Sequence, residues 1–265
     1  MTLGRIKRRI DRLLGRDLQQ RITREYRRAL RHGGHDFPRR VSLPAPCGRG
    51  LPERVVELLA ARLSYRPGLR VLDVGHAYIM ECHRDLLREL PAPRDLTGID
   101  IAEPIFDAGA LYTASVKGSV TDMEFPDASF DLVWCISALE HFGMDNSGYT
   151  GEFVVDERMA DRALREMMRV LRPGGSLLLT LPFGRYENHG WFRNFDAAHL
   201  AALLAPVRAG ATVHELYFRH TRRDGWSVAD PAALREVGYG DERNAGAAAC
   251  VVATIVAGRR AGEPG

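Results

Sequence analysis

The segment Val71-Leu72-Asp73-Val74-Gly75 decides the fold that this sequence predicts. Its apolar run ends at a glycine, which is typical of a short buried strand followed by a tight turn. A second run of the same length, Leu96-Thr97-Gly98-Ile99-Asp100, ends on a carboxylate. The residues between the two runs favour a helix near positions 85–90. Strand, helix and strand in this order predict a parallel βαβ unit.

The chain on both sides of this unit continues the alternation of strands and helices. Helices are expected after Pro52 and over residues 155–171. An irregular stretch containing Trp226 and Tyr239 is expected between the last two strands. The sequence therefore predicts the α/β class, with a doubly wound, mostly parallel seven-stranded sheet and an antiparallel C-terminal strand. The seven strands are expected at residues 70–74, 95–101, 112–116, 130–136, 176–181, 213–220 and 247–256.

Gly75 and Asp100 are the first candidate binding residues. They stand 25 residues apart, close to the separation between a nucleotide-binding loop and a ribose-binding carboxylate. A carboxylate there can accept hydrogen bonds from both ribose hydroxyls, and a glycine lets the backbone approach a ligand closely.

Five motifs in order give the chain a resemblance to a known family. It resembles the class I S-adenosylmethionine-dependent methyltransferases, in the branch related to small-molecule and menaquinone/ubiquinone-type enzymes. The resemblance implies a Rossmann-like fold and S-adenosyl-L-methionine as cofactor. The motifs are the two runs quoted above, Phe125-Pro126-Asp127-Ala128-Ser129-Phe130-Asp131-Leu132-Val133, Ala138-Leu139-Glu140-His141, and Met168-Arg169-Val170-Leu171-Arg172-Pro173-Gly174-Gly175-Ser176-Leu177.

The resemblance also implies the cofactor-binding residues, with two departures from the family pattern. The loop after Gly75 lacks the two further glycines of the family, and Ser119 stands where a carboxylate is usual. The adenine contact is therefore expected from the backbone of Val120 and the side chain of Asp122. The full set of expected cofactor contacts is Asp73, Gly75, Ala77, Tyr78, Asp100, Ile101, Ser119, Val120, Asp122 and Cys135.

Candidate catalytic residues follow the fourth expected strand. His141 can act as the base that takes a proton from the acceptor, since the pKa of imidazole is near neutral. The alternative is that His141 only hydrogen-bonds the cofactor or caps the next loop. Glu140 can orient His141, bind an amine or be a solvated carboxylate, and His189 is a rival base. No metal is implied.

The loop over residues 185–196 is the candidate acceptor wall. Tyr186, Glu187 and Trp191 stand where acceptors bind in the family, and an aromatic face packs well on a sugar ring. Together with the acidic residues near 140–161, this loop predicts a polar, sugar-bearing acceptor methylated on oxygen or nitrogen, such as an aminoglycoside-type antibiotic. Two alternatives stay open. One is a methyltransferase of an envelope glycan or lipid-linked sugar, and the other is a non-catalytic interaction protein with the same fold.

The N-terminal segment is strongly basic, since residues 1–32 hold ten Arg and one Lys but only three carboxylates. An apolar stripe through Ile6, Ile10 and Ile22 predicts a helical extension, and Gly and Pro over residues 33–50 suggest a linker. We therefore place a helix and linker at 1–50 and the methyltransferase domain at 51–265. The helix can pack on the domain as a lid or homodimer element, dock on an anionic membrane surface, or contact nucleic acid.

Composition sets broad limits on the function. With 45% hydrophobic and 27% charged residues, the chain falls in the globular range. Four widely spaced cysteines argue against a disulfide framework or a zinc site. Residues 1–30 lack the apolar core of a secretory signal, so a cytoplasmic location is expected. Cys135-Ile136-Ser137-Ala138 stands where many nucleic-acid methyltransferases carry an Asn/Asp-Pro-Pro-Tyr/Phe signature, so no nucleic-acid substrate is expected.

Overall fold

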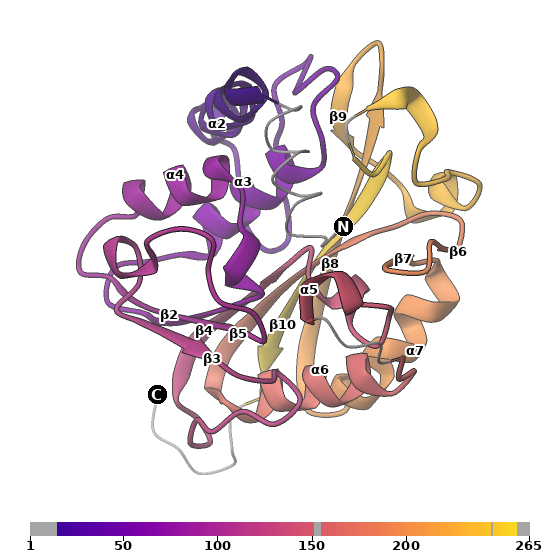
Figure 1. Cartoon of the computed structure of the whole chain (residues 1–265). Helices are drawn as coiled ribbons and strands as arrows, with labels where there is room; N and C mark the ends of the chain where they lie inside the picture. Colours follow the sequence, from indigo (N-terminus) through magenta and orange to yellow (C-terminus); the bar gives the residue numbers. More distant parts are fainter. Residues whose placement is uncertain (1–14, 151–154, 245, 259–265) are drawn as a thin grey trace.

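A single large sheet runs through the middle of the molecule (Figure 1). The computed structural model describes residues 15–150, 155–244 and 246–258. The strand order is β3-β2-β1-β4-β5-β10-β8-β9. The strands from β1 to β5 are parallel, and β10 is antiparallel to both of its neighbours. The strands are β1 (Arg70–Val74), β2 (Asp95–Asp100), β3 (Ala114–Lys117), β4 (Phe130–Ile136), β5 (Leu171–Pro182), β8 (Ala211–Thr221), β9 (Gly225–Val228) and β10 (Ala249–Ala257).

Helices cover both faces of this sheet (Figure 1). One face carries α2 (Gly15–His32), α3 (Arg54–Ser64) and α4 (Glu81–Glu89), and the other carries α6 (Met159–Arg169) and α7 (Ala197–Arg208). The two faces bury separate hydrophobic clusters, as expected for a doubly wound fold. Shorter elements are η1 (His76–Tyr78), η2 (Ala108–Ala110), η3 (Leu139–His141), α5 (Ser147–Thr150), the β6–β7 hairpin (Glu187–Asn188 and Arg193–Asn194), η4 (Pro231–Leu234) and η5 (Asp241–Arg243).

The apolar pattern of the sequence explains the central elements. In β4, the run from Leu132 to Cys135 has no exposed surface, because helices cover this strand on both faces. In α6, Ala160, Ala163, Leu164 and Met167 recur at helical spacing and are all buried. The α/β class, the mostly parallel sheet and the antiparallel C-terminal strand are therefore confirmed.

The sheet has one strand more than the seven predicted. Residues 225–228, expected to be irregular, form β9 and pair with β8 through a hairpin. Gly225 has a φ of +71°, and a Cβ there would overlap the carbonyl oxygen of Cys47. The indole of Trp226 is buried and donates to the carbonyl oxygen of Leu51. Four residues are too few to show an alternating pattern, so the sequence did not predict this strand.

The described part of the basic N-terminal helix packs on the domain. Ile22 and Tyr26 of α2 are fully buried in the cluster formed with α3 and α4. The Thr23 hydroxyl donates to Asp85, and the Tyr26 hydroxyl donates to Glu89. The apolar stripe of residues 15–32 is thus already covered, while Ile6 and Ile10 lie outside the described residues. Among the helices that the structure describes, none combines the length and hydropathy needed to cross a bilayer.

Candidate functional site

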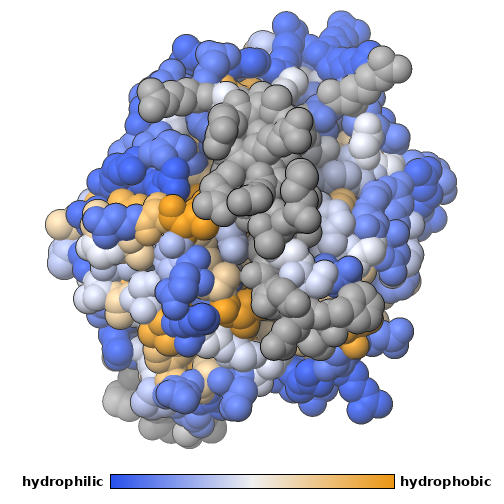
Figure 2. All heavy atoms as spheres, viewed as in Figure 1, coloured by the Kyte–Doolittle hydropathy of each residue, from blue (hydrophilic) through white to orange (hydrophobic). Residues whose placement is uncertain are grey.

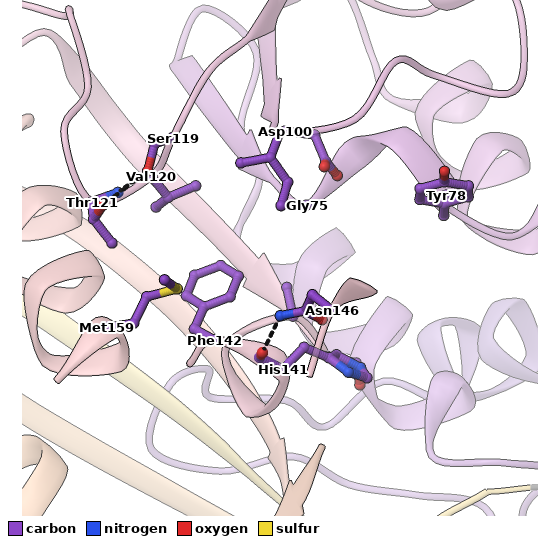
Figure 3. Close-up of a pocket in the computed structure, with 13 residues that line it drawn as sticks. Gly75, Tyr78, Asp100, Ser119, Val120, Thr121, His141, Phe142, Asn146 and Met159 are labelled. Carbon is purple, nitrogen blue, oxygen red and sulfur yellow. Dashed lines mark hydrogen bonds between the residues drawn. The ribbon is translucent and has the colours of Figure 1, made fainter. Parts of the chain in front are cut away.

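A pocket, partly open to solvent, lies beyond the carboxyl ends of β1 to β4. This is where open α/β sheets bind their ligands. Gly75 and Asp100 lie on one side of it and Phe142, His141 and Asn146 on the other (Figure 3). The lining consists of Gly75, Tyr78, Asp100, Ile101, Ser119, Val120, Thr121, Ser137, Ala138, His141, Phe142, Asn146 and Met159.

Gly75 brings the backbone close to the pocket. Its φ is +85°, which only glycine adopts without strain. A Cβ at this position would stand 2.8 Å from the Cβ of Ala138, so the loop after β1 and the turn after β4 touch at this glycine. The nitrogen of Gly75 donates to the carbonyl oxygen of Ile99 at the end of β2. A side chain at position 75 would therefore push Ala138 away and change the shape of the pocket.

Asp100 is held at the end of β2 by two backbone donors. Its Oδ2 accepts from the nitrogen of Ala77 at 3.0 Å, and its Oδ1 accepts from the nitrogen of Ala102 at 2.9 Å. A carboxylate has about four acceptor positions, so each oxygen keeps capacity for a ligand hydroxyl. Asp100 is thus oriented in advance, and Ala77 contributes its amide rather than its side chain.

His76 directly follows Gly75 in the loop that lacks the two further glycines of the family. Its imidazole is fully buried, and Nε2 lies 2.7 Å from the Ser115 hydroxyl. A Cβ at Gly98 would overlap this ring, so the glycine within β2 makes room for it. Burial lowers the pKa of His76, which favours the neutral ring. The loop after Gly75 turns through η1 instead of through further glycines.

The third group of predicted cofactor contacts lies after β3. Ser119 and Val120 line the pocket, as does Thr121, whose hydroxyl lies 2.8 Å from that of Ser119. Ile101 also lines the pocket and is 44% exposed, so it adds apolar surface there. Asp122 is exposed and is not part of the lining, so its side chain does not share this surface.

Two further residues predicted to contact the cofactor also lie outside the lining. The carboxyl of Asp73 is buried, accepts from the Tyr112 hydroxyl at 2.6 Å and lies 3.5 Å from Nε2 of His83. Burial raises the pKa of Asp73 to about 7. Cys135 is fully buried within β4. Both side chains support the strands beneath the pocket.

His141 is brought against the predicted acceptor loop. Its Nδ1 lies 2.9 Å from the carbonyl oxygen of Trp191, and the two rings stack with centroids 4.8 Å apart. A carbonyl oxygen only accepts, so Nδ1 must carry the hydrogen, and in the neutral ring Nε2 then has the lone pair. The two residues, 50 positions apart in the sequence, are thus in contact, although only His141 belongs to the pocket lining.

Glu140 points into a buried charged cluster near His141. It is 4% exposed, and its Oε1 lies 4.0 Å from Nε2 of His141. Burial, together with the nearby negative charge of Glu57, raises the pKa of Glu140 to about 8. Glu53 lies in the same cluster, and burial raises its pKa to about 7. With Arg54 as the cation of the cluster, this excess of carboxyls favours protonated forms.

Glu140→Gln is expected to make the stability less sensitive to rising pH. The folded protein holds this proton more tightly than the unfolded chain, whose ordinary pKa is 4.5. The free energy of unfolding therefore falls as the pH rises from 4.5 through about 8, and the amide removes this part of the fall. At pH 9 the Tm of the variant should exceed that of the parent by about 2–4 °C for each kcal/mol regained. Parallel Tm curves between pH 5 and 9 would contradict this assignment.

The rest of the predicted acceptor loop has mostly local partners. Glu187 pairs with His189 at 3.0 Å and with Arg185 at 2.8 Å. His189 stacks on Phe192, and Tyr186 stacks on His199 of α7. None of these residues belongs to the pocket lining, so they shape the β6–β7 hairpin that carries Trp191.

The acidic residues near 140–161, which favoured an aminoglycoside-type acceptor, also have local partners. Asp145 accepts from the nitrogen of Ser147, and Asp156 pairs with Arg162. Glu152 lies outside the described residues. Elsewhere in the described chain, no cluster of three or more His, Cys, Asp or Glu side chains is arranged to hold a metal ion.

Several lining residues were missed by sequence reasoning. Phe142 and Asn146 follow His141, and Met159 comes from the start of α6. Asn146 donates through its side-chain amide to the carbonyl oxygen of His141 (Figure 3). Their nearness to the Ala138–His141 motif was the available signal. Met159 gave none, because its position depends on how the chain returns after residue 154.

Comparison with known proteins agrees with this geometry. The model of the methyltransferase domain family matches residues 74–179, from the end of β1 into β5. This chain contains a class I S-adenosylmethionine-dependent methyltransferase domain. The methyltransferase domain is 32% identical over 142 residues to the 27-O-demethylrifamycin SV methyltransferase of Amycolatopsis mediterranei, covering 48% of this chain and 43% of that protein. It is 40% identical over 88 residues to the ubiquinone/menaquinone biosynthesis C-methyltransferase UbiE of Hahella chejuensis, covering 33% and 29%.

The chain therefore spans less than half the length of these curated relatives. A solved structure, the Burkholderia thailandensis 1,6-didemethyltoxoflavin-N1-methyltransferase with bound 1,6-didemethyltoxoflavin and S-adenosylhomocysteine, is also similar. It shows 19% identity and a TM-score of 0.48, covering 76% of this chain and 75% of that one.

The pocket of the methyltransferase domain fits S-adenosylmethionine, the cofactor of the family. Gly75, which has no side chain, lines the pocket with its backbone. Asp100 keeps acceptor capacity on each oxygen for ligand hydroxyls, and Ile101 and Val120 offer apolar surface for a base. These residues end or follow β1, β2 and β3, three neighbouring parallel strands, so the site requires the pairing of these strands.

Proposed function

We propose that this protein transfers a methyl group from S-adenosylmethionine to an oxygen or nitrogen of a small-molecule acceptor, with His141 as the base. The observation that carries this proposal is the hydrogen bond from Nδ1 of His141 to the carbonyl oxygen of Trp191. It fixes the ring of His141 at the wall of the cofactor pocket, and imidazole is the side chain whose ordinary pKa suits proton transfer near neutral pH.

The cofactor supplies an electrophilic methyl group bonded to a sulfonium. The chain holds the cofactor through Gly75, Asp100 and the apolar surface of Ile101. Methyl transfer also requires that the acceptor atom be held in line with the methyl group, at a fixed position and orientation. An acceptor hydroxyl also has to lose its proton, and Nε2 of His141 takes it.

Glu140 is proposed to orient His141, because its Oε1 lies 4.0 Å from Nε2 of the imidazole. His189 pairs with Glu187 outside the pocket, which makes it the weaker candidate for the base.

The acceptor is proposed to be a polar molecule with a ring that stacks on Trp191, such as a sugar-bearing metabolite. The indole of Trp191 is 39% exposed and stacks on His141, so its outer face is available next to the base. The face of the molecule drawn in Figure 2 shows hydrophobic patches among mostly hydrophilic side chains. By their names, the two relatives methylate oxygen or carbon, and the similar solved structure is named for methylation of nitrogen. These names do not decide the acceptor atom, so the choice of oxygen or nitrogen depends on the proposed base alone.

The alternative that the N-terminal helix docks on a membrane is now less well supported. The apolar residues of α2 that would enter a bilayer are packed against α3 and α4. A homodimer and a cytoplasmic location remain proposals with no further support.

The proposed function is tested by calorimetric titration with S-adenosylhomocysteine and by a screen for methyl transfer to sugars, aminosugars and phenols. We expect binding, and turnover with at least one hydroxyl or amine acceptor. With that acceptor, Trp191→Ala should raise KM about tenfold, since stacking on an aromatic face contributes roughly 1 kcal/mol or more, and should leave cofactor affinity unchanged. Absence of cofactor binding would favour the non-catalytic interaction protein.

A further inference from the structure

We infer that Glu57 is a positioning residue, which holds the turn after β4 in the conformation that shapes the pocket floor. This inference rests on the proposed function, because the pocket is the proposed cofactor site. Glu57 comes from α3, has no exposed surface and cannot reach a ligand itself. It acts through Ser137 and Ala138, which line the pocket.

A closed hydrogen-bond network links Glu57 to this turn. Oε1 of Glu57 accepts from the Ser137 hydroxyl at 2.6 Å and from the Thr180 hydroxyl at 2.8 Å. The Thr180 hydroxyl in turn accepts from the nitrogen of Ser137 at 3.0 Å. Oε2 of Glu57 lies 3.0 Å from a guanidinium nitrogen of Arg54. Each hydroxyl therefore has its donor role fixed, and one carboxylate orients both.

The turn needs such a clamp because its backbone is unusual. Ser137 has a φ of +44°, in the left-handed region that residues other than glycine rarely adopt. Such a conformation persists only where the surroundings over-determine it. Here both the hydroxyl and the amide of Ser137 are bound, one directly to Glu57 and the other through Thr180.

The turn transmits its position to the cofactor loop. Ala138 stands directly after Ser137, and its Cβ lies where a Cβ on Gly75 would come within 2.8 Å. If Ser137 relaxed to a common backbone conformation, Ala138 would move relative to Gly75. Both Glu57 and Thr180 lie outside residues 74–179, so the matched family model does not include this clamp.

The test measures S-adenosylhomocysteine affinity by calorimetry for Glu57→Gln, with and without Ser137→Gly. The amide keeps the size of the side chain but removes the charge that holds two hydroxyls. We expect Glu57→Gln to weaken binding about tenfold, and Ser137→Gly in the same chain to restore it to within about threefold, because glycine adopts the left-handed conformation without a clamp. Thr254→Val, which removes a buried hydroxyl from β10, is the matched control and should bind as the parent does.

A second measurement keeps the inference separate from the proposed function. Hydrogen exchange of the Ser137 amide in the ligand-free protein should accelerate in Glu57→Gln and not in Thr254→Val, whether or not the cofactor binds. If Glu57→Gln does not fold, Thr180→Val removes the same link and takes its place. Unchanged exchange, unchanged affinity in a protein that binds, or a loss that Ser137→Gly does not restore would overturn the inference. A parent protein that does not bind but shows the expected exchange would overturn only the proposed function.

Discussion

Replacing His141 with alanine is expected to lower kcat by about 10²–10⁴-fold, the usual contribution of a positioned general base. The affinity for S-adenosylhomocysteine should change little, because the proposed cofactor contacts, Asp100 and the Gly75 loop, lie on the other side of the pocket (Figure 3). Initial rates at saturating cofactor and acceptor give kcat, and calorimetry gives the affinity. For an amine acceptor, raising the pH should partly restore turnover, since a neutral amine needs no base.

His199→Ala is the matched control for this variant. His199 also stacks on an aromatic ring, that of Tyr186, but it lies on α7 outside the pocket lining. Its removal should leave kcat unchanged. Full turnover of His141→Ala at neutral pH would show that His141 is not the base. Loss of cofactor binding together with turnover would make it a cofactor contact instead.

Replacing Asp100 with alanine is expected to weaken S-adenosylhomocysteine binding by about 10²-fold or more. A hydrogen bond to a charged group contributes roughly 1.5–3 kcal/mol, and two ribose hydroxyls are available to this carboxylate. The variant also frees the amides of Ala77 and Ala102, which adds the cost of a less ordered loop. Calorimetric titration measures the change directly.

Asp95→Ala serves as the control for Asp100→Ala. Asp95 begins the strand that Asp100 ends, and its half-exposed carboxyl lies 3.6 Å from Arg70. Exposed ion pairs of this kind contribute about 1 kcal/mol or less, so the affinity should stay at the level of the parent. An unchanged affinity of Asp100→Ala would place the ribose site elsewhere.

The fold could be predicted from the sequence because its central strands consist mainly of apolar residues. Most residues of β4 and β1 are apolar, on both faces of the sheet, which is typical of a sheet that helices cover on both sides. The positions of Gly75 and Asp100 follow from the same reasoning, since each stands where a strand ends. The short strand β9 could not be predicted, because its pairing depends on the fit of Gly225 against Cys47.

The part of the site formed by His141 and the residues around it could be predicted only in outline. Both His141 and Trp191 were identified, but their stacking joins two loops that the sequence leaves 50 residues apart. Glu57 gave no signal at all, because a carboxylate between apolar residues of a helix is typical of a solvated face. It is buried because Ser137 and Thr180 supply hydroxyls at the end of two neighbouring strands. Local patterns do not contain that information.

The position of β10 has a consequence for how the chain acquires its structure during synthesis. This strand follows β8 and β9 in the sequence but lies between β5 and β8 in the sheet. The β8–β9 hairpin therefore cannot join the growing sheet until residues 249–257 have left the ribosome. Until then the edge of β5 is unpaired, and an unpaired strand edge is a template for association with other chains. The nascent chain thus passes through a state in which the parallel strands can already pair with one another. In that state β8 and β9 cannot yet join the sheet, because β10 has not been synthesised.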